Sequence, residues 1–236
     1  MTHSPIILAV DTPDFDIARR WVEATRESVG VFKFGLEFFL SFGGDGLRRI
    51  KSEYEIDIFL DLKLHDIPNT VGSAAKTLTS LAPRFLTVHA SGGGRMISAA
   101  VEALPDVDIT AVTILTSLSG EELREIGFSS GSTQSAVALA GLSVNAGARA
   151  VVSSPLEISA IREVIQDRAK IITPGVRPAS ALTSRNDDQV RVMTPRSAIE
   201  AGADYLVIGR PITQHWERGS AAMSNAAAGI LEEISS

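Results

Sequence analysis

The sequence predicts an α/β fold, a closed (β/α)8 barrel that forms a single domain over residues 1–236. Short apolar segments rich in β-branched residues recur along the whole chain, each with the length of a strand buried on both faces. Stretches with helical spacing separate them, which indicates parallel strands joined by helical crossovers. Eight such segments in 236 residues, close to the roughly 250 typical of this architecture, favour the barrel.

The first strand leads into a helix with a clear start signal. Thr12-Pro13-Asp14 supplies a cap candidate, a proline for the first turn and an early acidic residue. Apolar residues with helical spacing also occur in Ala74–Leu81, Met96–Ala103 and Ser197–Ala201. The expected strands are Ile6–Val10, Val29–Phe34, Ile56–Leu62, Phe85–Val88, Ile109–Leu115, Ala150–Ser153, Lys170–Thr173 and Tyr205–Ile208.

A doubly wound open sheet is the alternative arrangement of these elements. A dinucleotide-binding sheet of that kind needs Gly-x-Gly-x-x-Gly after its first strand, whereas this chain has Asp11-Thr12-Pro13-Asp14-Phe15 there. No linker, low-complexity tract or charge block divides the sequence, so one domain is expected.

Composition excludes several classes of function. Acidic residues outnumber basic ones by 28 to 22, a formal charge of -6, which makes nucleic acid an unfavourable partner but leaves small anionic ligands possible. The absence of cysteine excludes disulfides, thiolate metal sites and cysteine nucleophiles. No apolar run has the roughly 18 residues of a membrane span, and no signal peptide precedes Ile6, so we expect a cytoplasmic protein.

Charged or hydroxyl-bearing residues stand at the carboxyl end of nearly every expected strand. Working residues of such barrels lie at this end of the strands, so the expected mouth of the barrel is the candidate site. The residues are Asp11, Lys33, Asp61 with Lys63, His89, Thr116-Ser117, Ser153-Ser154, Thr173-Pro174-Gly175 and Gly209-Arg210.

Asp61 and Lys63 form the sharpest local pattern. Residues two apart on a strand share a face, and the alternating leucines around them are expected to face the helices. Asp61 and Lys63 then project into the mouth, near Asp11 and Lys33 of the first two strands. A charged pair on an exposed edge strand and a buried structural salt bridge are the alternatives. A mixed cluster at a barrel mouth nevertheless favours a site.

A second group of residues is suited to phosphate. Gly209 and Arg210 follow the eighth strand, where barrels often bind phosphate with backbone N–H groups and a short helix. Arg177 follows the seventh, and the polar stretch Ala179–Arg191 has the length of a lid or binding loop. The alternative is that both arginines are ordinary surface residues.

The remaining polar motifs are weaker indications of a functional site. Histidines occur at positions 3, 65, 89 and 215 without metal-ligand spacing, so no metal is expected. His89 is as compatible with a structural as with a catalytic part, and His65 is expected to face away from the mouth. Ser117 lacks the surroundings of a nucleophile elbow.

Taken together, these motifs resemble the orotidine 5'-phosphate decarboxylase family in its bacterial form. The resemblance runs in order from about residue 6 to residue 214. It rests on Asp11, Lys33, Asp61-x-Lys63-x-x-Asp66-Ile67-Pro68-Asn69-Thr70, Val88-His89-Ala90-Ser91-Gly92-Gly93, Val112-Thr113-Ile114-Leu115-Thr116-Ser117, Thr173-Pro174-Gly175-Val176-Arg177-Pro178, Asp188-Gln189 and Val207-Ile208-Gly209-Arg210-Pro211-Ile212-Thr213.

The resemblance implies decarboxylation of orotidine 5'-phosphate to uridine 5'-phosphate without cofactor or metal, the last step of pyrimidine nucleotide synthesis. It implies that Lys63 is the proton donor to C6 and that Asp61 faces the departing carboxylate. The implied catalytic residues are Lys63, Asp61, Lys33 and Asp66. The implied substrate-binding residues are Asp11, Lys33, Asp61, Ile67, Thr70, Thr116, Arg177, Gln189, Gly209 and Arg210, with Ser117 and Ser119 as alternatives to Thr116 at the pyrimidine.

The resemblance further implies a homodimer with shared active sites. Asp66 and Thr70 of one subunit are expected to reach the site of the other, since Pro68 turns this segment away from its own mouth. The alternative is that Asp66 caps its own following helix. Two other functions compete: a metal-dependent sugar-phosphate decarboxylase or isomerase, against which Lys33 argues, and a nucleotide-binding barrel without chemistry.

Overall fold

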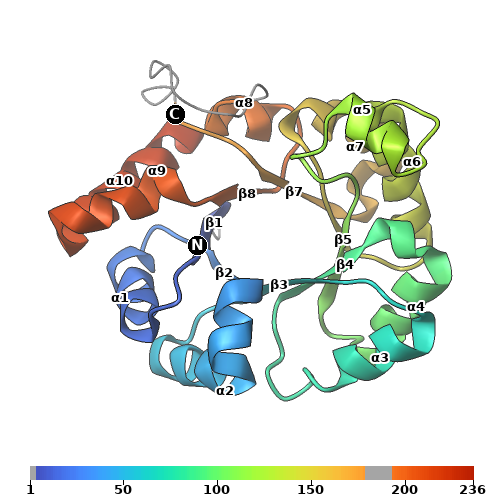
Figure 1. The fold of residues 1–236 in the computed structure, drawn as a ribbon. Coiled ribbons are helices and arrows are strands. Elements are labelled where there is room, and N and C mark those ends of the chain that lie inside the picture. The colour runs from blue at the N-terminus through green and yellow to red at the C-terminus, as the bar shows by residue number, and fades with distance from the viewer. Residues whose placement is uncertain (1–3, 179–192) are drawn as a thin grey trace.

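Eight parallel strands form a closed barrel in the order of the sequence, which confirms the predicted fold class. The structure is a computed structural model and describes residues 4–178 and 193–236; the stretch Ala179–Arg191, including Gln189, lies outside these residues. Helices surround the strands (Figure 1). The strands are β1 Ile6–Ala9, β2 Val31–Gly35, β3 Ile58–Leu64, β4 Phe85–His89, β5 Asp108–Val112, β6 Ala150–Val152, β7 Lys170–Pro174 and β8 Tyr205–Ile208.

The helices follow the strands as the crossover rule requires. Asp14 caps the first helix, because its Oδ1 accepts a hydrogen bond from the backbone N–H of Ile17 over 2.9 Å. The α-helices are α1 Phe15–Thr25, α2 Leu36–Tyr54, α3 Pro68–Lys76, α4 Gly94–Ala103, α5 Gly120–Glu125, α6 Ser132–Asn145, α7 Ile158–Ile165, α8 Pro195–Glu200, α9 Arg210–Thr213 and α10 Ser220–Ser235. None of the helices in the described ranges is long and apolar enough to cross a membrane.

The apolar residues form two buried clusters that follow the alternation of side chains along each strand. The larger cluster fills the space between strands and helices and includes Leu8, Leu60 and Ile171. The smaller one fills the barrel interior and consists of Ile7, Val31, Phe59, Phe85, Ala150, Ile172 and Tyr205. The interior is therefore packed, and a ligand has room only at the strand ends.

Some predicted boundaries are wrong. The third strand lies at Ile58–Leu64 rather than Ile56–Leu62, and β5 ends at Val112 rather than Leu115. Ile114 and Leu115 leave the sheet and line a pocket instead, so their apolar character reflects the pocket rather than a strand. Helix α3 begins at Pro68 and ends at Lys76, earlier than the predicted Ala74–Leu81, because Pro68 supplies its first turn.

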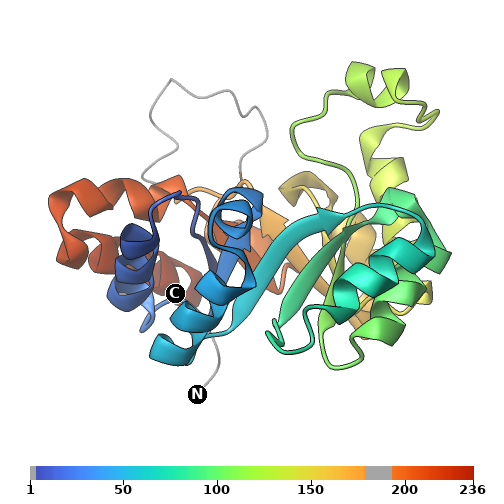
Figure 2. The same cartoon turned by 60° about the horizontal axis from the view of Figure 1, so that its bottom comes forward.

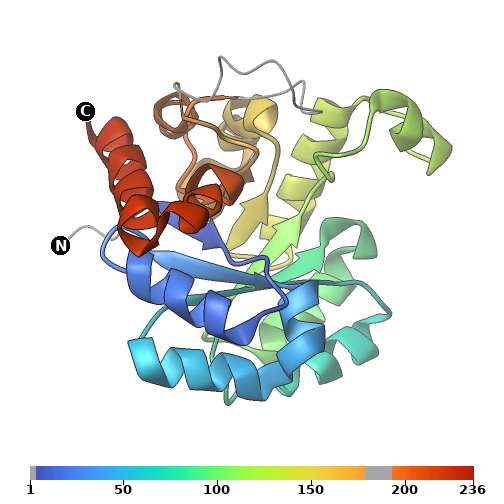
Figure 3. The same cartoon turned by 60° about the vertical axis from the view of Figure 1, so that its left-hand side comes forward.

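The connection between β5 and α6 carries α5 away from the barrel body (Figures 2 and 3). Ser119 and Glu122 form a capping box at the start of α5: the Ser119 hydroxyl accepts from Glu122 N–H, and the Glu122 carboxylate accepts from Ser119 N–H. This reciprocal cap gives the projecting helix a defined beginning on the mouth side of β5.

Candidate active site

Four side chains of alternating charge form one chain of contacts at the barrel mouth. Lys33 Nζ lies 3.1 Å from Asp11 Oδ1 and 3.6 Å from Asp61 Oδ2. Lys63 Nζ lies 2.8 Å from Asp61 Oδ1 and 2.9 Å from Asp61 Oδ2. The neighbouring strands β1, β2 and β3 deliver these residues, so sheet order places the charges side by side. The structure thus brings together Asp11, Lys33, Asp61 and Lys63.

The backbone of Lys63 departs from regular strand geometry. Its φ is 49°, in the left-handed region, and the β3–β4 register shifts between Leu60 and Leu64. The other non-glycine residues with positive φ in the described ranges, Glu55, Ala82 and Gln166, lie outside the strands. Such conformations cost on the order of 1–3 kcal/mol and persist where surrounding contacts enforce them. One such contact is the Lys63 N–H, which donates to Thr87 Oγ1 over 2.7 Å.

Asp61 lies at the centre of this network. Burial raises the pKa of Asp61, but the charges of Lys33 and Lys63 and hydrogen bonds from Lys63 and Thr87 outweigh it, so the pKa lies below its usual 3.8. The side chains of Lys33 and Asp61 are only 11% and 12% exposed, against 33% for Lys63. Asp61 is therefore a largely buried carboxylate that is ionised at neutral pH, and Lys63 is the more accessible cation.

A pocket of about 210 Å³ opens directly beside these charges. Its lining is mixed, with the charged network on one side and apolar side chains on the other, a typical composition for a small-molecule site. The lining residues are Lys33, Phe59, Asp61, Lys63, Val112, Ile114, Leu115, Thr116, Val152, Pro174 and Val207. A larger, more open depression of about 570 Å³ lies near the opposite end of β2 and β3, away from this network.

Of the three hydroxyls considered for the pyrimidine, the structure places Thr116 in the pocket lining. Ser119 uses its hydroxyl to cap α5. Ser117 is exposed and is not among the lining residues. Pocket geometry therefore favours Thr116.

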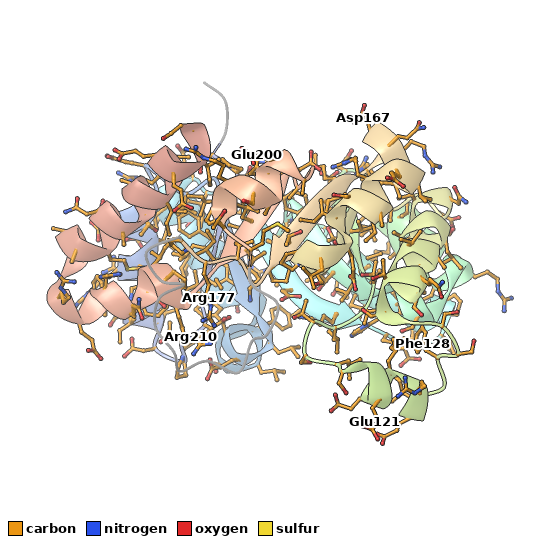
Figure 4. The ribbon with its side chains drawn as sticks, turned by 90° about the horizontal axis from the view of Figure 1, so that it is seen from above. Glu121, Phe128, Asp167, Arg177, Glu200 and Arg210 are labelled. Atoms are coloured by element: carbon orange, nitrogen blue, oxygen red, sulfur yellow. The ribbon has the colours of Figure 1, made fainter. Side chains whose placement is uncertain are left out.

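The two predicted phosphate-binding arginines follow adjacent strands. Pro174 of β7 pairs with Val207 of β8, and Arg177 and Arg210 each stand three residues further along. Figure 4 shows both arginines on the same side of the molecule, opposite Asp167. Gly209 precedes the short helix α9, and a Cβ at this glycine would lie 3.4 Å from that of Ala9, a tight contact.

Asp66, Ile67 and Thr70 lie apart from the network, at the exposed junction between β3 and α3. Asp66 Oδ1 accepts from the Ile67 N–H over 2.6 Å, and the Ile67 side chain is 65% exposed. Helix α3 has no side-chain cap, so the alternative that Asp66 caps it is wrong. In the described part of the chain, no hydrogen bond or ion pair joins Asp66 to Lys33, Asp61 or Lys63.

Thr87 is the residue that sequence reasoning missed. It is fully buried, accepts from the Lys63 N–H and donates to Asp61 Oδ1 over 3.0 Å. It therefore holds both the backbone of Lys63 and the carboxylate of Asp61 in place. The signal was present: Phe85, Thr87 and His89 share one face of β4, and a hydroxyl on an inward face needs a partner. His65 is exposed, does not line the pocket, and packs its ring against that of His89.

The chain is similar to known proteins over nearly its whole length. Residues 4–224 match the family described as Orotidine 5'-phosphate decarboxylase / HUMPS family. Orotidine 5'-phosphate decarboxylase of Thermobifida fusca (strain YX) is 48% identical over 95% of this chain and 95% of its own. That of Moorella thermoacetica is 45% identical over 94% and 90%, respectively.

A solved structure extends the similarity to three dimensions. The crystal structure of orotidine 5'-phosphate decarboxylase from Lactobacillus acidophilus superimposes with a TM-score of 0.84 and 33% identity, covering 99% of this chain and all of that one. The match includes every strand that contributes to the charged network and pocket. The chain therefore belongs to the orotidine 5'-phosphate decarboxylase / HUMPS family.

Proposed function

We propose that this protein converts orotidine 5'-phosphate to uridine 5'-phosphate and carbon dioxide, the last step of pyrimidine nucleotide synthesis. Family membership supports the reaction, and one observation carries it in this chain: Lys63, paired with buried Asp61, lines a pocket sized for part of a nucleotide. A fixed cation beside a fixed anion is what decarboxylation at C6 requires, because the bond broken leaves a negative charge on carbon.

Lys63 is the proposed proton donor. The bond between C6 and the carboxylate carbon breaks, carbon dioxide leaves, and the electron pair stays on C6. The ammonium of Lys63 stabilises this carbanion and transfers a proton to it, forming the C6–H bond of the product. Lys63 then regains a proton from solvent. The 33% exposure of its side chain leaves a route for that return.

Asp61, Lys33 and Thr87 hold the donor in place. Two short contacts from Asp61 and the Thr87 hydrogen bond to the Lys63 backbone fix both ends of that residue. Asp61 also repels the substrate carboxylate before the reaction, and loss of carbon dioxide relieves this repulsion. Lys33 bridges Asp11 and Asp61, so each charge of the network has an opposite charge beside it.

The remaining residues bind the rest of the nucleotide. Asp11 and Lys33 bind the ribose hydroxyls, and Thr116 binds the base. Gln189, Arg177, Gly209 and Arg210 bind the phosphate. The phosphate is remote from C6, so its binding energy can position the substrate rather than take part in bond breaking.

We further propose a homodimer in which Asp66, Ile67 and Thr70 complete the partner's site. The exposure of all three, and the separation of Asp66 from its own Lys63 network, support this arrangement. Mixing tests it: Lys63→Ala and Asp66→Asn are each nearly inactive, but a mixed dimer has one intact site. Random exchange makes about half the dimers mixed, so roughly a quarter of wild-type activity returns. Continued inactivity after verified exchange would place both residues in one site of one chain.

An ultraviolet assay with orotidine 5'-phosphate tests the reaction itself. Conversion to uridine 5'-phosphate changes the absorbance, and the rate should be the same with and without a chelator. Loss of activity with chelator would support the metal-dependent sugar-phosphate chemistry as the nearer relation. Tight binding without turnover would support a nucleotide-binding barrel instead.

A further inference from the structure

Two histidine rings are in contact where β3 and β4 end. Leu64 of β3 pairs with Val88 of β4, so His65, just beyond β3, lies beside His89, the last residue of β4. Their ring centroids are 5.3 Å apart, and the ring planes are inclined by 39°. This contact joins residues that are distant in sequence, and the proposed mechanism does not use it.

The ring of His65 also packs closely against the turn that follows His89. A Cβ at Gly92 would lie 3.2 Å from Cδ2 of His65 and 2.2 Å from Sδ of Met96. The His65 ring therefore lies against the backbone of the turn that follows His89, where a side chain on residue 92 would displace it. His65 is held between His89 and this turn although it remains exposed on its outer side.

The charges around His89 oppose its protonation. Burial lowers the pKa of His89 below the usual 6.5, and His65 and Lys63 lower it further, while Asp61 raises it. These are the titratable groups that act on the ring from β3 and its end. The His89 ring is therefore packed as a neutral group near pH 7, and a second positive charge beside Lys63 is unfavourable.

His65 immediately precedes the segment 66–70, which has few other constraints at its start. Within residues 4–178 and 193–236, Asp66 accepts a hydrogen bond only from the neighbouring Ile67 N–H, and Ile67 extends into solvent. On the other side of His65, Lys63 has left the regular strand. The ring of His65 is thus the side-chain anchor between the end of β3 and the beginning of α3.

We propose that the contact between the rings of His65 and His89 positions the segment 66–70. The proposal rests on the proposed function, in which this segment completes a decarboxylase site, and makes both histidines positioning residues rather than catalytic ones.

Paired substitutions test the ring contact. His65→Ala removes the contact and should lower kcat/KM at pH 8 by on the order of 10- to 100-fold, the effect of misplacing a contributing group. His65→Phe keeps an aromatic ring at this position, so it should recover most of that loss. His215→Ala, on the other side of the barrel, is the matched control and should behave like wild type.

Amide hydrogen exchange tests the anchor without substrate. Residues 65–70 should exchange faster in His65→Ala than in wild type, with β8 as internal reference. His65→Phe should restore most of the wild-type protection. Equal exchange in all three proteins would overturn the proposal, as would a wild-type kcat/KM in His65→Ala. Absence of turnover in wild type would instead refute the proposed function, leaving the exchange result to decide the anchor.

Discussion

The two ends of the barrel both carry linked ion pairs, yet they differ in what the cations face. At the amino-terminal end, Arg84 Nη1 lies 2.7 Å from Asp57 Oδ2 and its Nη2 donates to the Tyr205 hydroxyl. Lys170 Nζ lies 2.7 Å from Asp108 Oδ2. At the mouth, Lys63 and Lys33 share Asp61, and the Lys63 distance of 2.8 Å is close to those two. Distance alone does not distinguish a site from a structural contact.

The surroundings of the cations differ between the two ends of the barrel. Arg84 lies 5.3 Å from the ring centroids of both Phe85 and Tyr205, and Lys170 lies 5.6 Å from that of Phe85, so these cations cover the aromatic floor of the barrel. Lys63 instead lines an open pocket, from a strained backbone position. An ion pair therefore indicates a reactive site when its cation faces space that a ligand can fill.

The largest expected difference concerns the two lysines. Lys63→Ala should reduce kcat by at least about 10⁴-fold, because it removes both the cation and the proton donor. Lys170→Ala should keep near-normal turnover and lower the thermal midpoint instead. Single-turnover assays, thermal melts and circular dichroism measure both. Near-normal turnover of folded Lys63→Ala would contradict the assigned mechanism.

The second largest effect on activity is expected for Arg210→Ala. The loss of one charged contact to the phosphate should lower kcat/KM for orotidine 5'-phosphate by on the order of 10²–10³. Turnover of the unphosphorylated nucleoside should change little, since it makes no such contact. Arg149→Ala, which removes an exposed partner of Asp108 at the other end, is the matched control. Equal losses on both substrates would assign Arg210 to the fold or to the chemistry.

Thr87→Val should have a smaller effect on activity, about tenfold in kcat, because the pair Asp61–Lys63 remains but loses its alignment. The Lys63 N–H also loses its acceptor, which costs roughly 1–3 kcal/mol of stability. Tyr205→Phe removes the corresponding hydroxyl from Arg84 at the other end and should affect stability alone. If both variants changed only the urea midpoint, Thr87 would be structural like Tyr205.

The smallest expected effect is a difference in pH dependence. The pKa of Asp61 is lowered in the folded protein, so its contribution is complete above the unfolded value of about 3.8 and is lost as the pH falls through the folded value. Below about pH 4 the free energy of unfolding should therefore fall more steeply in wild type than in Asp61→Asn. Urea titrations between pH 6 and 3 measure the two slopes, and parallel curves would show that the lysines do not stabilise the charged form.

Local patterns in the chain were enough to predict the barrel and the charged members of the site. A strand buried on both faces must be apolar, so a charge at its carboxyl end stands out, as at Asp11, Lys33 and Asp61. The spacing of Asp61 and Lys63 also predicted that they project together, and the structure joins them. Each of these inferences depends on neighbours in sequence or on strand order.

The contacts across strands could not be predicted from the sequence, because they depend on how the barrel closes. Thr87 meets Lys63 from 24 positions away, and His89 meets His65 because β3 and β4 are in that register. The positive φ of Lys63 and the early end of β5 at Val112 likewise have no signal in residue type. Side-chain alternation tells which face a residue occupies, but the register shift in β3 sets what lies opposite it, and that shift exists only once the barrel has closed.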